Sequence, residues 1–319
     1  MNKIRAAVIG VGYLGRFHAQ KYAQMEGCEL VAVVDGREEA RKAVAAEVGS
    51  QAVGDYRELL GKVDAVSVVT PTPAHFEIAD AFLAAGAHVL VEKPITETPE
   101  QARSLIARAA REKRVLQVGH LERFNAAVLA AEPHIKAPRF MECVRLAPYK
   151  ERGTDVNVVL DLMIHDIDLV QSLAGSDLVS IDAIGTPVFS GEIDIANARL
   201  RFANGCVANT TASRVSLKTE RKLRIFEADA YLSLDLQQKI LTLIRKRTGV
   251  PQPGQLPVSI EEANLEQGDA LKAEIASFLD CIRNNQRPIV SGEDGLRALE
   301  TAIRITEQVH ANLGKLPAS

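Results

Sequence analysis

Two groups of residues in this sequence carry side chains that can move a proton to or from a bound alcohol. The first is Glu92-Lys93-Pro94, which directly follows an apolar run. A lysine therefore stands at the end of a predicted strand, with a proline fixing the turn. An ammonium group that is partly buried near another positive charge loses its proton more easily. Lys93 could then orient a hydroxyl group or relay its proton, although a solvated lysine paired with Glu92 would give the same sequence.

The second group lies within residues 160–168. On a helix, Asp161 and His165 are four residues apart and His165 and Asp168 are three apart, so all three share one face. Flanking carboxylates hold a histidine in one tautomer and stabilise its imidazolium form, as a general base requires. A solvated acidic face and a divalent metal site are the alternatives.

The start of the chain has a pattern typical of dinucleotide binding. Gly10, Gly12 and Gly15 follow an apolar run with the spacing G-x-G-x-x-G, and a second apolar run ends at Asp35. The first glycine permits a tight turn, the second lets a pyrophosphate approach the backbone, and the third lets helix and strand pack closely. The positive end of the following helix then faces the phosphates. The pattern favours a dinucleotide site over a turn that binds no phosphate.

Asp35 also bears on which dinucleotide binds. A carboxylate at this strand end can accept hydrogen bonds from the adenosine ribose, whereas a 2′-phosphate would meet like charge. Two unit charges about 4 Å apart repel by roughly 4 kcal/mol at an effective dielectric constant of 20. Arg37 could pair with a phosphate and acts in the other direction. We therefore expect NAD, with NADP the weaker candidate, and no metal beside His165, because hydride transfer to a nicotinamide needs none.

The elements that must position these residues differ between the two halves of the chain. Apolar runs in the first 120 residues alternate with segments of helical spacing, which predicts a parallel sheet with right-handed crossovers. Strands are expected at residues 6–9, 30–34, 65–69, 88–91 and 116–118, and helices at 15–24, 38–48, 56–60, 74–85 and 99–112. The prolines that follow strands lie at the carboxyl edge of such a sheet, where ligands bind.

The second half has a different texture. After a helical pattern at 156–173, runs of alternating polarity predict an open, largely antiparallel sheet, and Asn204-Gly205 is a hairpin signal. These strands are expected at 179–188, 192–202, 206–215, 221–227, 230–236 and 239–244, followed by a loop at 249–256 and helices at 269–284 and 295–313. The fold class is thus α/β: an N-terminal doubly wound Rossmann sheet (1–120) and a C-terminal α+β domain (121–319). The last helices could pack back on the first domain.

Composition excludes several other classes of protein. The chain has 319 residues, enough for two domains, and a formal net charge of -3, so we expect no nucleic-acid partner. No apolar run reaches the length of a membrane span, and the N-terminus runs straight into a strand, which argues against a signal peptide. Cys28, Cys143, Cys206 and Cys281 are scattered and indicate reduced thiols in a cytoplasmic protein. We assign only structural roles to His18, His88, His134 and His310.

Taken together, the motifs resemble the Gfo/Idh/MocA family of oxidoreductases. The resemblance spans nearly the whole chain, and the Glu-Lys-Pro tripeptide is its most specific part. It rests on residues 10–15, Thr70-Pro71 with His75, Glu92-Lys93-Pro94, residues 119–125, Asp161 with His165, and residues 288–295.

Several expectations follow from this resemblance. It implies that Lys93 is the catalytic lysine, that Asp161 and His165 act as a pair, and that the open C-terminal sheet packs against a partner subunit to form a dimer or tetramer. It places Tyr13, Leu14, Thr70, Pro71, His75, Glu92 and Lys93 at the cofactor, together with the three glycines, Asp35 and Arg37. It places His120, Arg123, Asn125, Asp161 and His165 at the substrate.

Within the family, residues 118–125 and 158–168 are most similar to members that oxidise the 3-hydroxyl of UDP-N-acetylglucosamine for lipid A assembly. Many members have a glycine pair before the helix that bears Asp161, whereas this chain has Asp155-Val156-Asn157, so contacts of that loop are not carried over. We expect NAD-dependent oxidation of a secondary alcohol on a sugar or sugar nucleotide. The alternatives are a dehydrogenase of another polyol or aldose such as an inositol, an NADP-linked carbonyl reductase, and a non-catalytic nicotinamide-binding regulator.

Overall fold

The computed structural model describes residues 3–150, 156–247 and 256–314 of the chain. The chain divides into two compact units: unit 1 comprises Met1–Leu121 and Asp269–Leu299, and unit 2 comprises Glu122–Gly268 and Glu300–Ser319. Asp155 and nearly all of the predicted 249–256 loop lie outside the described residues.

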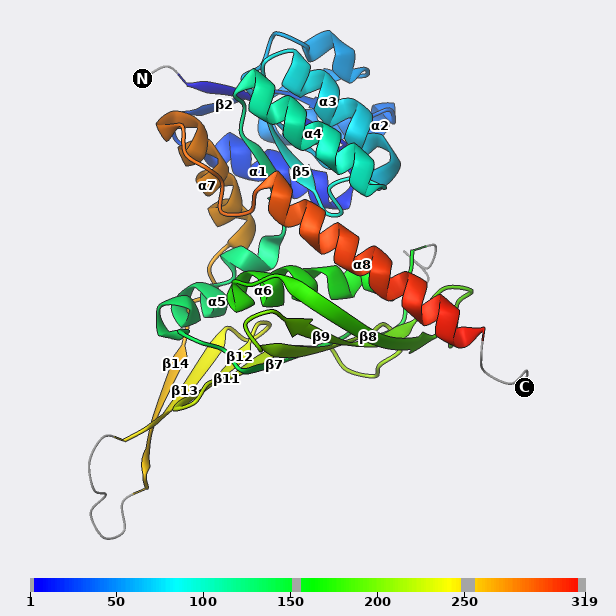
Figure 1. Cartoon of the computed structure of the whole chain (residues 1–319). Coiled ribbons are helices and arrows are strands. Elements are labelled where there is room, and N and C mark those ends of the chain that lie inside the picture. The colour runs from blue at the N-terminus through cyan, green and yellow to red at the C-terminus, as the bar shows by residue number, and fades with distance from the viewer. Residues whose placement is uncertain (1–2, 151–155, 248–255, 315–319) are drawn as a thin grey trace. The chain divides into compact units, whose positions relative to one another are not determined.

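Unit 1 is built on a six-stranded sheet with the order β3-β2-β1-β4-β5-β6 (Figure 1). Every pairing in this sheet is parallel, which confirms the predicted Rossmann fold. The strands are β1 (Ile4–Ile9), β2 (Cys28–Val34), β3 (Gln51–Val53), β4 (Ala65–Val68), β5 (His88–Glu92) and β6 (Leu116–Gly119). The short strand β3 was not predicted, because Gln51 and Ala52 are exposed and show no apolar run.

Helices cover both faces of this sheet. They are α1 (Tyr13–Gln24), α2 (Glu38–Val48), α3 (His75–Ala84), α4 (Pro99–Glu112) and α7 (Ala270–Asn284), with 3₁₀ turns at Tyr56–Leu59, Thr72–Ala74 and Leu121–Phe124. The residues at the helix ends explain where α4 begins. Thr98 and Gln101 form a capping box there, and Pro99 lies in the first turn. The predicted helix at 56–60 is a single 3₁₀ turn capped by Asp55.

The core of unit 1 includes a helix from the far end of the chain. Leu271, Ile275 and Phe278 of α7 belong to the same buried cluster as Ala19 and Tyr22 of α1 and the apolar residues of β1 and β2. The α7 helix begins at Asp269, whose carboxylate accepts the Lys272 N–H. Unit 1 is therefore completed by a segment that lies about 150 residues beyond its last strand, as the boundaries of its two segments indicate.

Unit 2 contains an eight-stranded sheet with the order β14-β13-β12-β11-β7-β10-β9-β8. All pairings are antiparallel except that of β7 with β10, so the sheet is mixed but largely antiparallel, as expected. The predicted turn at Asn204-Gly205 joins β9 to β10, with Gly205 at φ 87°. The strands are β7 (Phe140–Leu146), β8 (Leu178–Thr186), β9 (Ile195–Phe202), β10 (Val207–Ser213), β11 (Glu220–Phe226), β12 (Ala230–Asp235), β13 (Ile240–Lys246) and β14 (Val258–Asn264).

Helices lie on one face of the unit 2 sheet (Figure 1). They are α5 (Ala126–Ala131), a 3₁₀ turn (Glu132–His134), a π-helical turn (Val159–Met163) that leads into α6 (Ile164–Ala174), and α8 (Gly292–Leu313). The α8 helix begins in unit 1 and ends in unit 2. There, Gln308 and Asn312 donate to the Ile181 and Ala183 carbonyls of β8.

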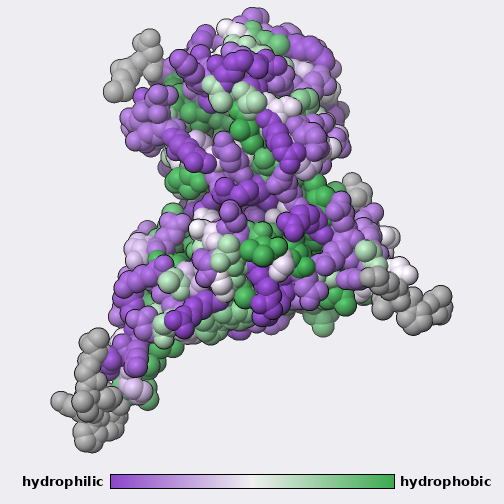
Figure 2. Space-filling view, in the orientation of Figure 1, coloured by the Kyte–Doolittle hydropathy of each residue, from purple (hydrophilic) through white to green (hydrophobic). Residues whose placement is uncertain are grey.

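Figure 2 shows one face of each unit, coloured by hydropathy. Hydrophilic side chains cover most of the face of each unit that Figure 2 shows, with apolar side chains in small groups between them. Over the part of the chain that the structure describes, no helix combines the length and apolar character that crossing a membrane requires.

Candidate active site

The glycine turn of unit 1 has the geometry that a pyrophosphate needs. Gly10 has φ 87°, and a Cβ atom there would lie 2.7 Å from the Val69 carbonyl oxygen. A Cβ at Gly15 would lie 1.8 Å from the Gly10 carbonyl oxygen, so only glycine allows α1 to begin so close to β1. At Gly12 the nearest atom to such a Cβ is 3.8 Å away, in the Arg37 side chain. The backbone at Gly12 is thus open to a ligand, and no acidic side chain lies in the first turn of α1.

Asp35 closes this turn from the end of β2. One of its carboxylate oxygens accepts the Val11 N–H at 3.0 Å, and the other accepts the Arg37 N–H at 2.9 Å and Arg37 Nε at 3.3 Å. Burial opposes ionisation, but these hydrogen bonds outweigh it and hold the pKa of Asp35 below its ordinary value. A negative charge is therefore fixed beside the glycine turn, while the Arg37 side chain is 71% exposed.

The loop after β4 is tied to the loop after β5 by a histidine. The His75 ring is buried, with Nδ1 2.9 Å from the Pro94 carbonyl oxygen and Nε2 2.8 Å from the Thr70 carbonyl oxygen. It joins the turns that bear Thr70-Pro71 and Lys93-Pro94, and its assignment to the cofactor stays a prediction. Thr70 Oγ1 is buried without a hydrogen-bond partner among the described residues, which leaves one polar atom at this sheet edge for a ligand.

Lys93 follows the buried end of β5. Glu92 is 9% exposed and Lys93 is half-buried, and the peptide bond between Lys93 and Pro94 is cis. Burial opposes ionisation of Glu92, but its hydrogen bond to His18 and the charges of His18 and Lys93 lower its pKa. Unit 1 thus presents an anionic carboxylate and a lysine at the carboxyl edge of its sheet.

Unit 2 supplies Asp161 and His165, both half-buried. Asp161 lies in the π-helical turn and His165 in the first turn of α6, so a change of helix type separates them. Turns of this type are frequent at functional sites. Asn157 caps this segment, because its side-chain oxygen accepts the N–H groups of Val159 and Leu160.

The other acids near His165 have arginine partners. Asp168 accepts Arg123 Nε at 2.9 Å, and Asp166 binds Arg145 through contacts as short as 2.7 Å. All four side chains are buried. Asp161 and Asp168 were both predicted to flank His165. Asp168 instead belongs to a buried ion pair with Arg123, whereas Asp161 does not belong to that pair.

Three of the residues assigned to the substrate are buried. Arg123 binds Asp168 and the hydroxyl of Ser172, which leaves its substrate role a prediction. Asn125 caps α5 by accepting the Ala127 N–H and donates to the Leu236 carbonyl. In unit 1, His120 follows β6 and is 1% exposed. No described residues form a group of three or more His, Cys, Asp or Glu that could hold a metal ion.

His18, to which sequence reasoning assigned a structural role, contacts the carboxylate that precedes Lys93. Its Nε2 is 3.2 Å from Glu92 Oε1, and the ring is completely buried. Helical spacing could have indicated this position from the sequence. His18 follows Gly15 by one helical turn, so both residues face the sheet. Glu274 of α7, which is buried and lies within reach of the Glu92 charge, could not be found from local pattern.

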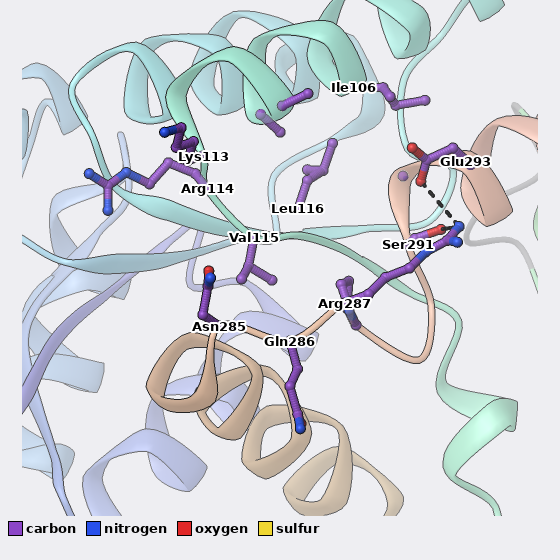
Figure 3. Close-up of a pocket in the computed structure, with 14 residues that line it drawn as sticks. Ile106, Lys113, Arg114, Val115, Leu116, Asn285, Gln286, Arg287, Ser291 and Glu293 are labelled. Carbon is purple, nitrogen blue, oxygen red and sulfur yellow. Dashed lines mark hydrogen bonds and ion pairs between the residues drawn. The ribbon is translucent and has the colours of Figure 1, made fainter.

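Two of the hollows among the described residues lie in unit 1. One of about 500 Å³ adjoins the glycine turn and is lined by Val11, Gly12, Tyr13, Arg16, Phe17, Gln20 and Arg37. The other, of about 560 Å³, lies between the end of α4, the start of β6 and the segment joining α7 to α8 (Figure 3). In Figure 3, Lys113 and Arg114 extend away from Arg287, which pairs with Glu293. Because the second hollow adjoins the amino end of β6, it is not the dinucleotide site.

Comparison with known proteins identifies the family. Residues 4–120 match the model of the oxidoreductase family with an NAD-binding Rossmann fold, and residues 130–232 match that of the Gfo/Idh/MocA C-terminal domain. The chain belongs to the Gfo/Idh/MocA family. It is an oxidoreductase with a nicotinamide-cofactor domain, as the sequence resemblance predicted.

Individual relatives cover nearly the whole chain. UDP-N-acetylglucosamine 3-dehydrogenase from Acidithiobacillus ferrooxidans is 41% identical over 98% of this chain and 99% of its own length. A solved structure of that protein has a TM-score of 0.93, covering 99% of this chain and 100% of its own. A scyllo-inositol 2-dehydrogenase (NAD(+)) from Bacillus subtilis is 26% identical over 96% of this chain and 94% of its own length.

Proposed function

We propose that this enzyme oxidises the 3-hydroxyl of UDP-N-acetylglucosamine to a 3-keto sugar nucleotide, using NAD. The observation that carries the proposal is the 41% identity over 98% of the chain to a UDP-N-acetylglucosamine 3-dehydrogenase, against 26% to an inositol dehydrogenase. A 3-keto sugar nucleotide is a substrate for transamination, and we place it in the assembly of lipid A. Four buried cysteines without disulfide bonds support a cytoplasmic location.

The residues of unit 1 fit a nicotinamide dinucleotide. The open backbone at Gly12 and the N-terminus of α1 provide groups for its polar atoms. The Thr70 hydroxyl, which has no hydrogen-bond partner among the described residues, provides another. Bound NAD would accept the hydride that leaves the carbinol carbon. The fixed charge of Asp35 disfavours a 2′-phosphate and supports NAD over NADP.

We assign the proton chemistry to Lys93 and to the pair Asp161–His165. His165 removes the hydroxyl proton, Asp161 orients and charge-balances the imidazole, and Lys93 donates a hydrogen bond to the reacting oxygen. The proposal requires that these side chains reach the same sugar hydroxyl when substrate binds, since hydride transfer depends on close and aligned reactants.

The test is incubation with NAD and a panel of sugar nucleotides, with inositols and free aldoses as the competing substrate class. Mass spectrometry should show loss of two hydrogens from UDP-N-acetylglucosamine, and an added aminotransferase should trap the ketone. If the enzyme oxidised an inositol but not the sugar nucleotide, the proposed substrate would be wrong and the enzyme would be an inositol dehydrogenase. Absence of turnover with every substrate would favour a non-catalytic regulator.

We also propose that the enzyme is a homo-oligomer formed through the unit 2 sheet. On the face opposite the helices, a row of apolar side chains crosses five strands at paired positions. The row comprises Phe140, Phe226, Tyr231, Ile244 and Ile260. Phe226 is 36% exposed and Ile260 is 58% exposed, and the Phe226 ring packs at a tilt against those of Phe140 and Tyr231. A partner subunit would remove this row from water.

A further inference from the structure

A buried chain of hydrogen bonds ends at the lysine turn of unit 1. The Tyr22 hydroxyl lies 2.9 Å from Ser67 Oγ, which lies 3.2 Å from His18 Nδ1. His18 Nε2 lies 3.2 Å from Glu92 Oε1, and Glu92 Oε2 accepts the Lys93 N–H at 3.3 Å. The chain links α1, β4 and β5 and stops at the residue to which we assign contact with the reacting oxygen.

This chain is almost completely enclosed. His18, Tyr22 and Ser67 have no exposed surface, and Glu92 is 9% exposed. An ionised carboxylate at such a place is costly unless it is paired and hydrogen-bonded. His18 supplies the pairing, and the Lys93 backbone supplies the second hydrogen bond.

The neighbouring strand leaves space for the carboxylate. Gly119 of β6 lies opposite Glu92 of β5 in the parallel register. A Cβ atom at Gly119 would lie 2.8 Å from both the carboxyl carbon and Oε1 of Glu92. Glycine at this position therefore lets the carboxylate occupy one place between His18 and the lysine turn.

Two buried carboxyl groups, those of Glu92 and Glu274, have pKa values that are shifted in opposite directions. His18 contacts Glu92 from α1, Lys93 directly follows Glu92 at the end of β5, and the charge of Glu92 acts on Glu274 of α7. Neither carboxyl oxygen of Glu274 has a hydrogen-bond partner among the described residues, and burial together with the charge of Glu92 raises its pKa. Glu92 is thus a paired anion, whereas Glu274 is a neutral acid. Such opposite charge states in neighbouring carboxyl groups are found at functional sites.

We propose that His18 and Glu92 form a positioning dyad for Lys93. Glu92 accepts a hydrogen bond from the Lys93 backbone and places a negative charge beside the Lys93 side chain. The contact of His18 with the other carboxylate oxygen holds Glu92 in this position. Neither residue needs to contact substrate. The inference rests on the proposed role of Lys93.

The experiment is a double-mutant cycle with His18→Asn, Glu92→Gln and both together. Each single variant should lower kcat about 10- to 100-fold, because small displacements of a positioning group have effects of this size. The KM for the sugar nucleotide and the Kd for NADH should change less than about threefold. The double variant should be no slower than the slower single variant, since the two side chains act as one unit.

A second readout does not depend on turnover. Acylation of Lys93, measured by mass spectrometry of its peptide across a pH series, should change its pH dependence equally in both single variants. His88→Gln is the matched control, because His88 is a part-buried histidine at the other end of β5 that accepts the Val115 N–H.

The outcomes separate the two proposals. Multiplicative losses of kcat in the double variant, or unchanged Lys93 labelling in both single variants, would overturn the dyad. A wild-type enzyme without turnover but with altered Lys93 labelling in both variants would overturn the proposed function and retain the dyad. Normal NADH binding shows that each variant has folded.

Discussion

At the scale of single residues, the proposed proton chemistry can be tested directly. Lys93→Met and His165→Asn should each lower kcat at least about 10³-fold, because each removes a group assigned to the reacting oxygen. NADH binding, followed by fluorescence, should persist in both variants. His310→Gln, an exposed histidine of α8, serves as control. Near wild-type rates in both variants would show that Lys93 and His165 do not carry the proposed proton chemistry.

The charge of Asp35 makes a prediction about the cofactor. Asp35→Asn keeps an oxygen that can accept the Val11 N–H but removes the negative charge. It also releases Arg37, now held by Asp35, to bind a 2′-phosphate. The ratio of kcat/KM with NADP to that with NAD should rise at least about tenfold. An unchanged ratio would mean that another group excludes NADP.

Glu274 predicts an unusual dependence of stability on pH. Burial and the charge of Glu92 raise its pKa, so the folded chain keeps a proton that the unfolded chain loses above about pH 4.3. Stability therefore falls by about 1.4 kcal/mol for each pH unit between the unfolded and folded pKa values. Glu274→Gln avoids this loss.

Melting temperatures should show the difference. The Glu274→Gln variant should melt above wild type, by a margin that widens from pH 5 to pH 8. Glu266→Gln, at an exposed position, should show no such trend. A margin that stays constant or narrows with rising pH would contradict the neutral state of Glu274.

At the scale of elements, the sequence predicted most of what positions the site. The regular strands and helices of unit 1 follow from buried apolar runs and capping residues, as at Thr98. Strand β7 escaped prediction because its inward positions include Arg145, whose buried charge depends on Asp166 of α6. Strand β14 carries Glu261 and Glu262 at the edge of the sheet and lacks an apolar pattern.

Two features of the site depend on distant contacts. The π-helical turn at Val159–Met163 alters the helix that carries Asp161, and residue spacing alone assumes a uniform α-helix. The place of His18 depends on Glu92, which lies 74 residues further along the chain. Pattern identifies such residues as candidates, but tertiary packing decides which of them meet.

The capped start of this helix gives an element-scale prediction. Asn157→Ala removes the acceptor for the Val159 and Leu160 N–H groups at a buried site. The free energy of unfolding should fall by about 1–2 kcal/mol. Because Asp161 lies in the turn so capped, kcat should fall as well. Denaturant titration and initial rates measure the two effects, and Asn264→Ala at an exposed position is the control. Unchanged stability would show that this cap is dispensable.

At the scale of the whole molecule, the apolar row on the unit 2 sheet predicts an assembly. Phe226→Glu combined with Ile260→Glu places two charges on that row and should dissociate the oligomer into monomers. Light scattering coupled to size-exclusion chromatography measures the change. Leu129→Glu, which is 41% exposed on α5, should leave the mass unchanged. A wild-type chain that is monomeric at micromolar concentration would contradict the proposal.

The return of α7 to unit 1 has a consequence for protein engineering. A nucleotide-binding module excised at residue 121 would lose Leu271, Ile275 and Phe278, and the surfaces of Ala19 and Tyr22 that they cover would face water. Such a fragment should be insoluble, so a chimera that exchanges cofactor modules between relatives must transplant two stretches of gene. Recombination breakpoints that respect this rule lie near residues 121, 269 and 299.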